Sequence, residues 1–242
     1  MQWFRNLKTA SKLMLGFALV GVIMAGVGYM GVSSLAKING MLVTLYARDM
    51  AGLSAVKQAE IELFTIGRDM RQSLLIDKEA RAPIVQQIEK TDAELRDNLK
   101  KYEQSLATAE GKAKFAELEK TYAEYLGVVK DVMKLSVAGE DKAAKERLAA
   151  GMSTVRKVVE QMDGLAVIKE TLGKKVFGES ADLYSSSRTL MITFIVVGVL
   201  LGLALGYFTA NLITKALKHV VTKTEEAAAG DLTARIALES KD

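Results

Sequence analysis

The segment LMLGFALVGVIMAGVGYMGV, residues 13–32, contains no charged side chain. An α-helix rises 1.5 Å per residue, so this segment would extend about 30 Å, the thickness of the hydrocarbon core of a bilayer. A second uncharged stretch runs from Thr189 to Thr214 and contains MITFIVVGVLLGLALGYFTANLI at residues 191–213. The sequence therefore predicts two transmembrane helices, at residues 13–33 and 189–213.

A cleaved signal peptide is the alternative interpretation of the first segment. Its basic flank fits a signal peptide, and Val32 and Ser34 form a tolerable cleavage site. The apolar core of a signal peptide is about 7–15 residues long, however, which is shorter than residues 13–32. A retained membrane anchor is the favoured interpretation.

Basic residues flank both predicted spans on the side that faces the chain termini. Residues 1–12 carry three of them, including Lys8 and Lys12, and no acid, while Lys215 and Lys218 follow the second span. Under the positive-inside rule both ends are cytoplasmic. Residues 33–187 carry equal numbers of basic and acidic side chains, so the segment 34–188 is then expected on the opposite side of the membrane.

Apolar residues between the spans recur at intervals of three and four, as in amphipathic helices and not in strands. Turn-forming stretches divide this region into four segments, at residues 34–76, 83–108, 112–137 and 141–187. Short loops between long amphipathic helices make neighbouring helices antiparallel. The sequence thus predicts an all-α fold in which two transmembrane helices flank an up-down-up-down four-helix bundle.

Nothing in the sequence separates the first and fourth bundle segments from the membrane spans. We expect one helix to run from Leu13 to near Ile76 and another from Asp141 through Ile213. A displacement of the fourth helix outside the membrane would then reach the cytoplasmic end of the second span directly.

Residues 214–242 begin as a helix, because Leu217, Val220 and Val221 follow helical spacing. Gly230 is expected to end this helix with a left-handed cap. One short helix and an extended tail make a poor folding unit. We therefore expect the chain to be the front portion of a longer protein.

Composition excludes several classes of enzyme. The 242 residues include no Cys, one His (His219) and one Pro. Disulfides, thiolate metal sites and a cysteine nucleophile are excluded, and a histidine zinc site or a Ser-His-Asp triad is not expected. We expect no catalytic residues, no metal and no cofactor. Nucleic-acid binding is not expected either, because the basic clusters adjoin the spans, where lipid headgroups account for them.

Several motifs resemble bacterial methyl-accepting chemotaxis receptors with a four-helix-bundle ligand-binding domain. They are LKTASKLMLGF (residues 7–17), SSLAKINGMLVTLY (33–46) and IGRDMRQSLL (66–75). The segments ITKALKHVV (213–221) and AAAGDL (227–232) resemble the first helix and connector of a HAMP domain. Gly230, Asp231 and Leu232 match its most specific motif, whereas Ala216 stands where the family commonly has proline.

The resemblance covers essentially the whole chain. It implies a homodimeric receptor in the bacterial inner (cytoplasmic) membrane, with residues 34–188 as a periplasmic sensor and residues 214–242 as a partial HAMP domain. Gly230, Asp231 and Leu232 would relay the signal to a cytoplasmic kinase-coupling module. The same input half also occurs in sensor histidine kinases and diguanylate cyclases, and a purely structural membrane-anchored coiled coil is a third possibility.

Two arginines near the membrane-distal end of the first bundle helix suggest a ligand. Arg68 and Arg71 share a helix face with three apolar residues, and this face differs from the predicted core seam. Apolar residues interspersed with arginines outside the core are typical of a second contact surface, such as a dimer interface. The apolar residues of this face are Ile61, Phe64 and Leu75, and the seam comprises Leu63, Ile66, Met70 and Leu74. Adjacent guanidinium groups repel unless an anion joins them, and arginine binds carboxylates in a bidentate manner.

The opposing fourth helix brings Arg147 and Thr154 to about the same height. We therefore predict that Arg68, Arg71, Arg147 and Thr154 contact a small organic anion. The alternative is that the arginines are solvated or pair locally, as Arg71 could with Asp69 or Asp77.

Overall fold

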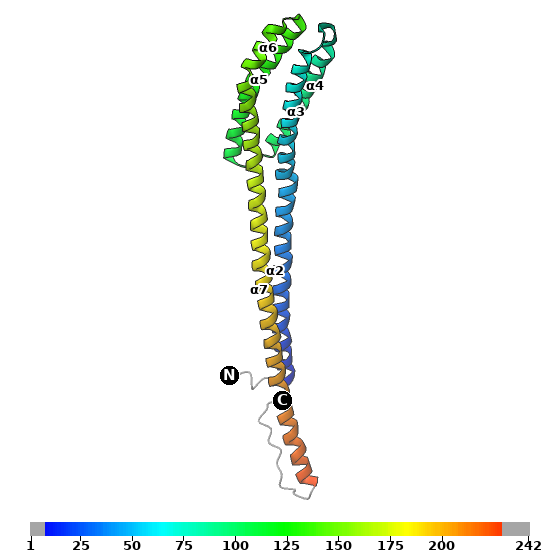
Figure 1. Cartoon of the computed structure of the whole chain (residues 1–242). Coiled ribbons are helices and arrows are strands. Elements are labelled where there is room, and N and C mark those ends of the chain that lie inside the picture. The colour runs from blue at the N-terminus through cyan, green and yellow to red at the C-terminus, as the bar shows by residue number, and fades with distance from the viewer. Residues whose placement is uncertain (1–7, 229–242) are drawn as a thin grey trace. The chain divides into compact units, whose positions relative to one another are not determined.

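The computed structural model describes residues 8–228, and these are helical almost throughout, with no strand in that range. The elements are α2 (Thr9–Thr44), the π-helix η1 (Leu45–Met50), α3 (Ala51–Ser73), the 3₁₀-helix η2 (Lys78–Ala80), α4 (Ala82–Gln104), α5 (Ala109–Ala138), α6 (Asp141–Ala150) and α7 (Met152–Ala228) (Figure 1). The all-α prediction is confirmed. The chain divides into two compact units, Met1–Ile38 with Ala181–Asp242, and Asn39–Ser180.

In the first unit, parts of α2 and α7 pack as an antiparallel pair. Small residues allow the two backbones to approach, as in packed membrane helices. A Cβ atom on Gly31 would lie 3.2 Å from Met191 Cε, and one on Gly198 would lie 3.2 Å from Ile23 Cγ2. Both helices are long and apolar enough to cross a membrane. They are consistent with the two predicted spans.

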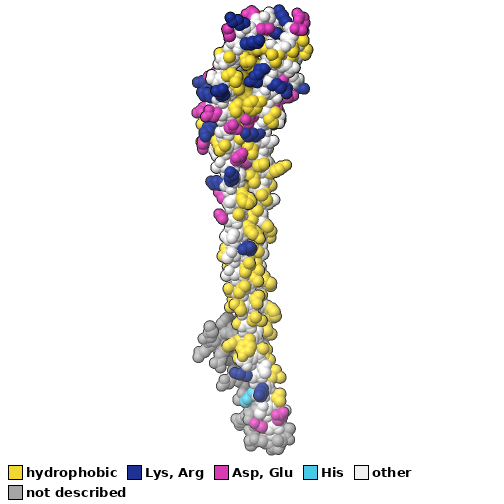
Figure 2. All heavy atoms as spheres, viewed as in Figure 1, with side chains coloured by type: hydrophobic (Ala, Val, Ile, Leu, Met, Phe, Trp, Pro, Cys, Tyr) yellow, Lys and Arg dark blue, Asp and Glu magenta, His cyan; other side chains and the backbone are white. Residues whose placement is uncertain are grey.

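The second unit is a four-helix bundle of α3, α4, α5 and a fourth limb. This α6–α7 limb consists of α6 and the part of α7 up to Ser180. The core of the bundle includes the predicted α3 seam and two fully buried tyrosines, Tyr102 and Tyr125. Charged side chains gather over this unit in Figure 2. At the start of α5, the Thr108 hydroxyl accepts a hydrogen bond from the Gly111 amide, and Gly139 ends α5 at φ 82°. The loop after α5 lies where the sequence predicts it. The turn predicted at residues 109–112 is instead the start of α5, because the Thr108 cap begins the helix earlier.

Both long helices are less regular than the sequence indicates. The wide turn of η1 lies between α2 and α3, and α3 ends at Ser73. The expected uninterrupted helix from Asp141 is wrong, because a turn at Gly151 separates α6 from α7. A Cβ atom on Gly151 would lie 2.4 Å from Val128 Cγ1, so any other residue at this position would force Val128 or the helices to shift. The predicted signal-relay residues Gly230, Asp231 and Leu232 lie outside the described residues.

Candidate functional site

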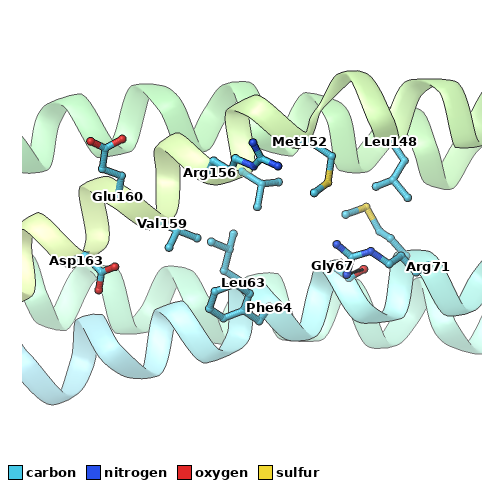
Figure 3. Close-up of a pocket in the computed structure, with 12 residues that line it drawn as sticks. Leu63, Phe64, Gly67, Arg71, Leu148, Met152, Arg156, Val159, Glu160 and Asp163 are labelled. Atoms are coloured by element: carbon cyan, nitrogen blue, oxygen red, sulfur yellow. Dashed lines mark hydrogen bonds between the residues drawn. The ribbon is translucent and has the colours of Figure 1, made fainter.

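An open groove of about 460 Å³ runs along the bundle between α3 and the α6–α7 limb (Figure 3). This volume suits a small organic molecule. The walls are mainly apolar, with Leu63, Phe64 and Met70 on the α3 side and Leu148, Met152, Val155 and Val159 on the opposite side. The last four are only partly buried. They are therefore available to contact a bound molecule.

The groove is lined by two arginines and two acidic residues. Arg71 and Arg156 belong to opposite walls, while Glu160 and Asp163 follow Arg156 along α7. Asp163 Oδ1 is 2.7 Å from Lys57 Nζ, an ion pair that bridges α3 and α7. Arg71 Nη1 donates a hydrogen bond of 3.2 Å to the Gly67 carbonyl oxygen. Arg156 makes no hydrogen bond or ion pair with residues 8–228.

The structure brings only Arg71 of the four predicted ligand contacts into this groove. Arg68 is 69% exposed, and its Nη2 is 2.8 Å from Asp69 Oδ1, so local pairing holds for Arg68 rather than for Arg71. Arg147 Nε donates to Asp131 Oδ2 on α5 at 2.9 Å, and Thr154 does not line the groove. The face of the limb that carries Arg147 and Thr154 is directed toward α5. Ligand binding by Arg68, Arg71, Arg147 and Thr154 remains a prediction.

Arg156 is not among the ligand contacts predicted from the sequence. Met152 and Val159 lie on the groove wall with Arg156, at the intervals of three and four that mark a shared helix face. That spacing was a usable signal. The choice between the faces carrying Arg147 and Arg156 depends on the rotation of the limb, which the close approach at Gly151 helps to set.

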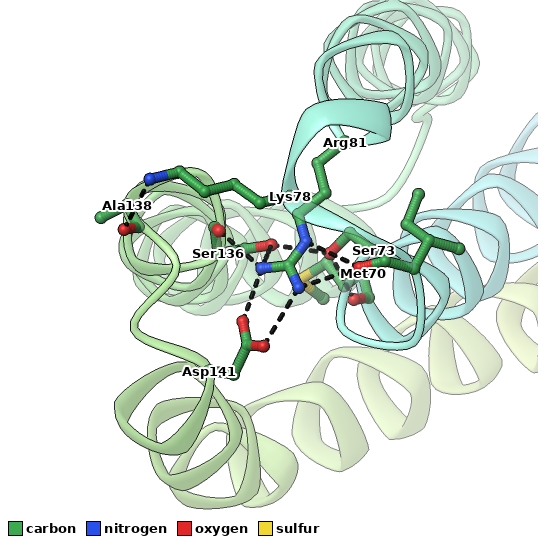
Figure 4. Close-up of polar contacts among 8 residues, drawn as sticks. Met70, Ser73, Lys78, Arg81, Ser136, Ala138 and Asp141 are labelled. Carbon is green, nitrogen blue, oxygen red and sulfur yellow. Dashed lines mark hydrogen bonds and ion pairs between the residues drawn. The ribbon is translucent and has the colours of Figure 1, made fainter.

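The buried side chain of Arg81 hydrogen-bonds to residues in and beside the loops at one end of the bundle (Figure 4). Its guanidinium donates to the Ile76 carbonyl at 2.9 Å and to the Ser136 carbonyl at 2.7 Å. It also pairs with both carboxylate oxygens of Asp141, at 2.5 and 3.1 Å. Arg81 thereby links the turn after α3, the end of α5 and the start of α6, and both α3 and α6 contribute residues to the groove. Its only sequence signal was the placement of Arg81 and Asp141 in loops at the same end of an up-down-up-down bundle.

The Arg81–Asp141 pair predicts a specific sensitivity to acid. The hydrogen bond from Arg81 lowers the pKa of Asp141 below the ordinary 3.8, and the opposing effect of burial is smaller. A folded-state pKa below the unfolded value gives stability that is present above about pH 4 and lost as the pH falls through the folded value. Asp141→Asn should lower the thermal midpoint at pH 7 and make it less dependent on acid. Near-UV circular dichroism at pH 7 and pH 3 measures both effects, and equal acid-induced shifts in the two proteins would contradict the prediction.

A second polar cluster lies inside the bundle beside the π-helix. Lys169 and Asp49 are 2% and 1% exposed, and Lys169 Nζ is 3.2 Å from Asp49 Oδ1. Lys169 also donates to the Ser105 carbonyl at 2.5 Å, and Arg48 Nη2 lies 2.9 Å from Asp49 Oδ2. A Cβ atom on Gly52 would lie 2.9 Å from Lys169 Cε, so glycine leaves room for the lysine. The cluster fixes the register of α7 against the start of α3.

The pKa values of Asp49 and Lys169 are both shifted by their surroundings. Burial alone would raise the pKa of Asp49, but hydrogen bonds from Arg48 and Lys169 outweigh it and the pKa is lowered. Burial lowers the pKa of Lys169, and the hydrogen bond with Asp49 only partly offsets that effect. The burial of Lys169 could have been predicted from the sequence, because residues 162, 166 and 169 follow helical spacing and Met162 and Ala166 belong to the core.

A family model described as a four helix bundle sensory module for signal transduction matches residues 6–184. The chain belongs to this family. The sensory module is also similar to a protein of Acetivibrio thermocellus described as a sensory transducer, with 22% identity over 170 residues. The match covers 70% of this chain and 30% of that relative, so the chain spans less than a third of the relative's length. The chain therefore contains a four-helix-bundle sensory module of the kind used for signal transduction. Within residues 8–228, the sensory module contains no group of three or more His, Cys, Asp or Glu residues arranged to hold a metal.

Proposed function

We propose that the chain is the input portion of a chemoreceptor in the bacterial inner membrane. Its sensory module lies in the periplasm, binds a small organic anion and acts as a receptor rather than an enzyme. The apolar segments of α2 and α7 span the bilayer. The signal passes through α7 and the HAMP segment to a cytoplasmic chemotaxis module that couples to a kinase. The similarity to a sensory transducer protein supports this role.

The continuity of α7 is the observation that carries the proposal. One helix of 77 residues contains the groove residues Met152 to Asp163 and also the apolar segment 189–213. A ligand that favours one position of the first turns of α7 acts on the same element that enters the membrane. The ligand shifts the equilibrium only to the extent that it binds one position more tightly than the other.

An exposed apolar stripe on α3 supports a homodimer. Ile61 and Phe64 on α3, and Leu75 in the turn that follows α3, are 57%, 54% and 82% exposed. Contiguous exposed apolar side chains of this kind indicate a contact surface. We propose that a second copy of the chain covers the stripe, with the two α3 helices in contact.

Cross-linking in spheroplasts tests topology and dimerisation together. The chain has no native cysteine, so Ile61→Cys and Leu75→Cys each introduce a single reactive thiol. We expect a membrane-impermeant bis-maleimide to link both variants into dimers, because the stripe is periplasmic and lies between two copies. Glu119→Cys, on the exposed face of α5, is the matched control and should be labelled without dimerising.

The outcomes separate the two parts of this proposal. Labelling of Ile61→Cys without cross-linking would contradict the dimer. Labelling only after the cells are lysed would contradict the periplasmic location of the sensory module.

A further inference from the structure

We propose that the groove between α3 and the α6–α7 limb binds a monocarboxylate with an apolar body, whose carboxylate lies between Arg71 and Arg156. This inference rests on the proposed role as a receptor for a small organic anion. It deepens that role by assigning the site to a groove within one subunit and by naming Arg156.

The two arginines form the anion-binding end of the groove. Arg71 hydrogen-bonds only to a backbone carbonyl, and Arg156 has no partner among residues 8–228. They project from opposite walls (Figure 3), so a carboxylate between them would contact both helices. Hydrogen bonds between guanidinium and carboxylate groups are strong and directional. Such a ligand would neutralise two like charges and join α3 to α7.

The remaining charges of the groove favour a single negative charge on the ligand. Asp163 is already paired with Lys57 across the two helices. Glu160 lies one turn beyond Arg156 on the way to that pair, and it too makes no ion pair within the described residues. A second carboxylate at the far end of the ligand would approach Glu160 and be repelled. The groove therefore discriminates against dicarboxylates.

The apolar walls determine the body of the ligand. Between the arginines and the Lys57–Asp163 pair, the lining includes Leu63, Phe64 and Val159, whereas Leu148 and Met152 lie on the other side of Arg156 (Figure 3). Burying a methylene group there should strengthen binding about four-fold per group. A hydrocarbon chain or ring fits this lining better than a polar body.

Equilibrium dialysis with the full 242-residue chain in nanodiscs tests the site, with empty nanodiscs as the blank. The probes are hexanoate, adipate and hexanamide, which share six carbons but differ in charge. We expect saturable binding of hexanoate, weaker binding of adipate and no binding of hexanamide. Affinity should rise from butanoate to hexanoate.

Three variants locate the site. Arg156→Gln should weaken hexanoate binding at least about ten-fold, as expected for a lost charge-assisted hydrogen bond. Gly67→Leu keeps both arginines but fills the groove. It should fold, because a Cβ atom at Gly67 meets only Arg71 Nη1, at 3.7 Å, and it should abolish binding. Lys157→Gln is the matched control, because Lys157 is the neighbouring residue on α7, is exposed and does not line the groove; it should retain wild-type affinity.

Each contrary result has a defined meaning. Absence of saturable hexanoate binding to the wild-type chain would overturn the assigned ligand class. Undiminished binding by folded Arg156→Gln or Gly67→Leu would overturn the groove while leaving an anion receptor in place. Failure of the proposed membrane receptor itself would appear separately, in the cross-linking of Ile61→Cys.

Discussion

Replacing Lys169 with methionine should lower the free energy of unfolding of the sensory module by about 3 kcal/mol, because removing one partner leaves the other charge buried without full compensation. Methionine fills a similar volume, so the loss reports the charge rather than a cavity. The value lies at the lower end of the range for broken buried ion pairs because Arg48 still pairs with Asp49.

Urea unfolding of the chain in nanodiscs measures this loss. The single tryptophan is Trp3, whereas Tyr102 and Tyr125 are fully buried in the bundle. The near-UV circular dichroism of these tyrosines therefore reports on unfolding of the sensory module.

The control is Lys175→Met on the same helix. Lys175 pairs with Glu179, but the two side chains are 71% and 51% exposed. An exposed pair of this kind contributes little, so stability should change by no more than about 0.5 kcal/mol. The double variant Lys169→Met with Asp49→Leu should recover much of the stability, since it leaves no buried unpaired charge. Equal effects of Lys169→Met and Lys175→Met would show that the buried ion pair is not a structural constraint.

Alanine at two glycines of the fourth bundle limb should have opposite effects. Gly151→Ala places a methyl group 2.4 Å from Val128 Cγ1, and this buried, β-branched side chain cannot move aside easily. We expect a loss of about 1–3 kcal/mol, as is typical of an overpacked core. Gly164→Ala lies in the interior of α7 with no atom within 4 Å of the added methyl group, so it should gain about 0.5–1 kcal/mol from reduced backbone entropy of the unfolded chain.

The same urea measurement distinguishes these variants. If Gly151→Ala were as stable as the wild type, the contact between the limb and α5 would not require glycine. Because the limb carries one wall of the groove, Gly151→Ala should also weaken hexanoate binding, whereas Gly164→Ala should not.

The helices, the bundle core and the two apolar segments can all be predicted from local patterns in the sequence. These features repeat locally, because a helix brings residues three and four apart onto one face. The α3 seam of Leu63, Ile66 and Met70 is buried as predicted. The length of an uncharged stretch likewise identifies a candidate span without reference to any other element.

Only the tertiary structure decided which side chains face one another. The π-helix η1 and the turn at Gly151 interrupt the regular helical repeat. The spacing of apolar residues in the sequence does not reveal either interruption. Arg147 consequently pairs with Asp131 while Arg156 borders the groove, and Arg81 reaches residues that are 55 and 60 positions away. The physical reason is that the rotation of a helix about its axis is set by its closest contacts, such as that of Gly151 with Val128, and those contacts join residues distant in sequence.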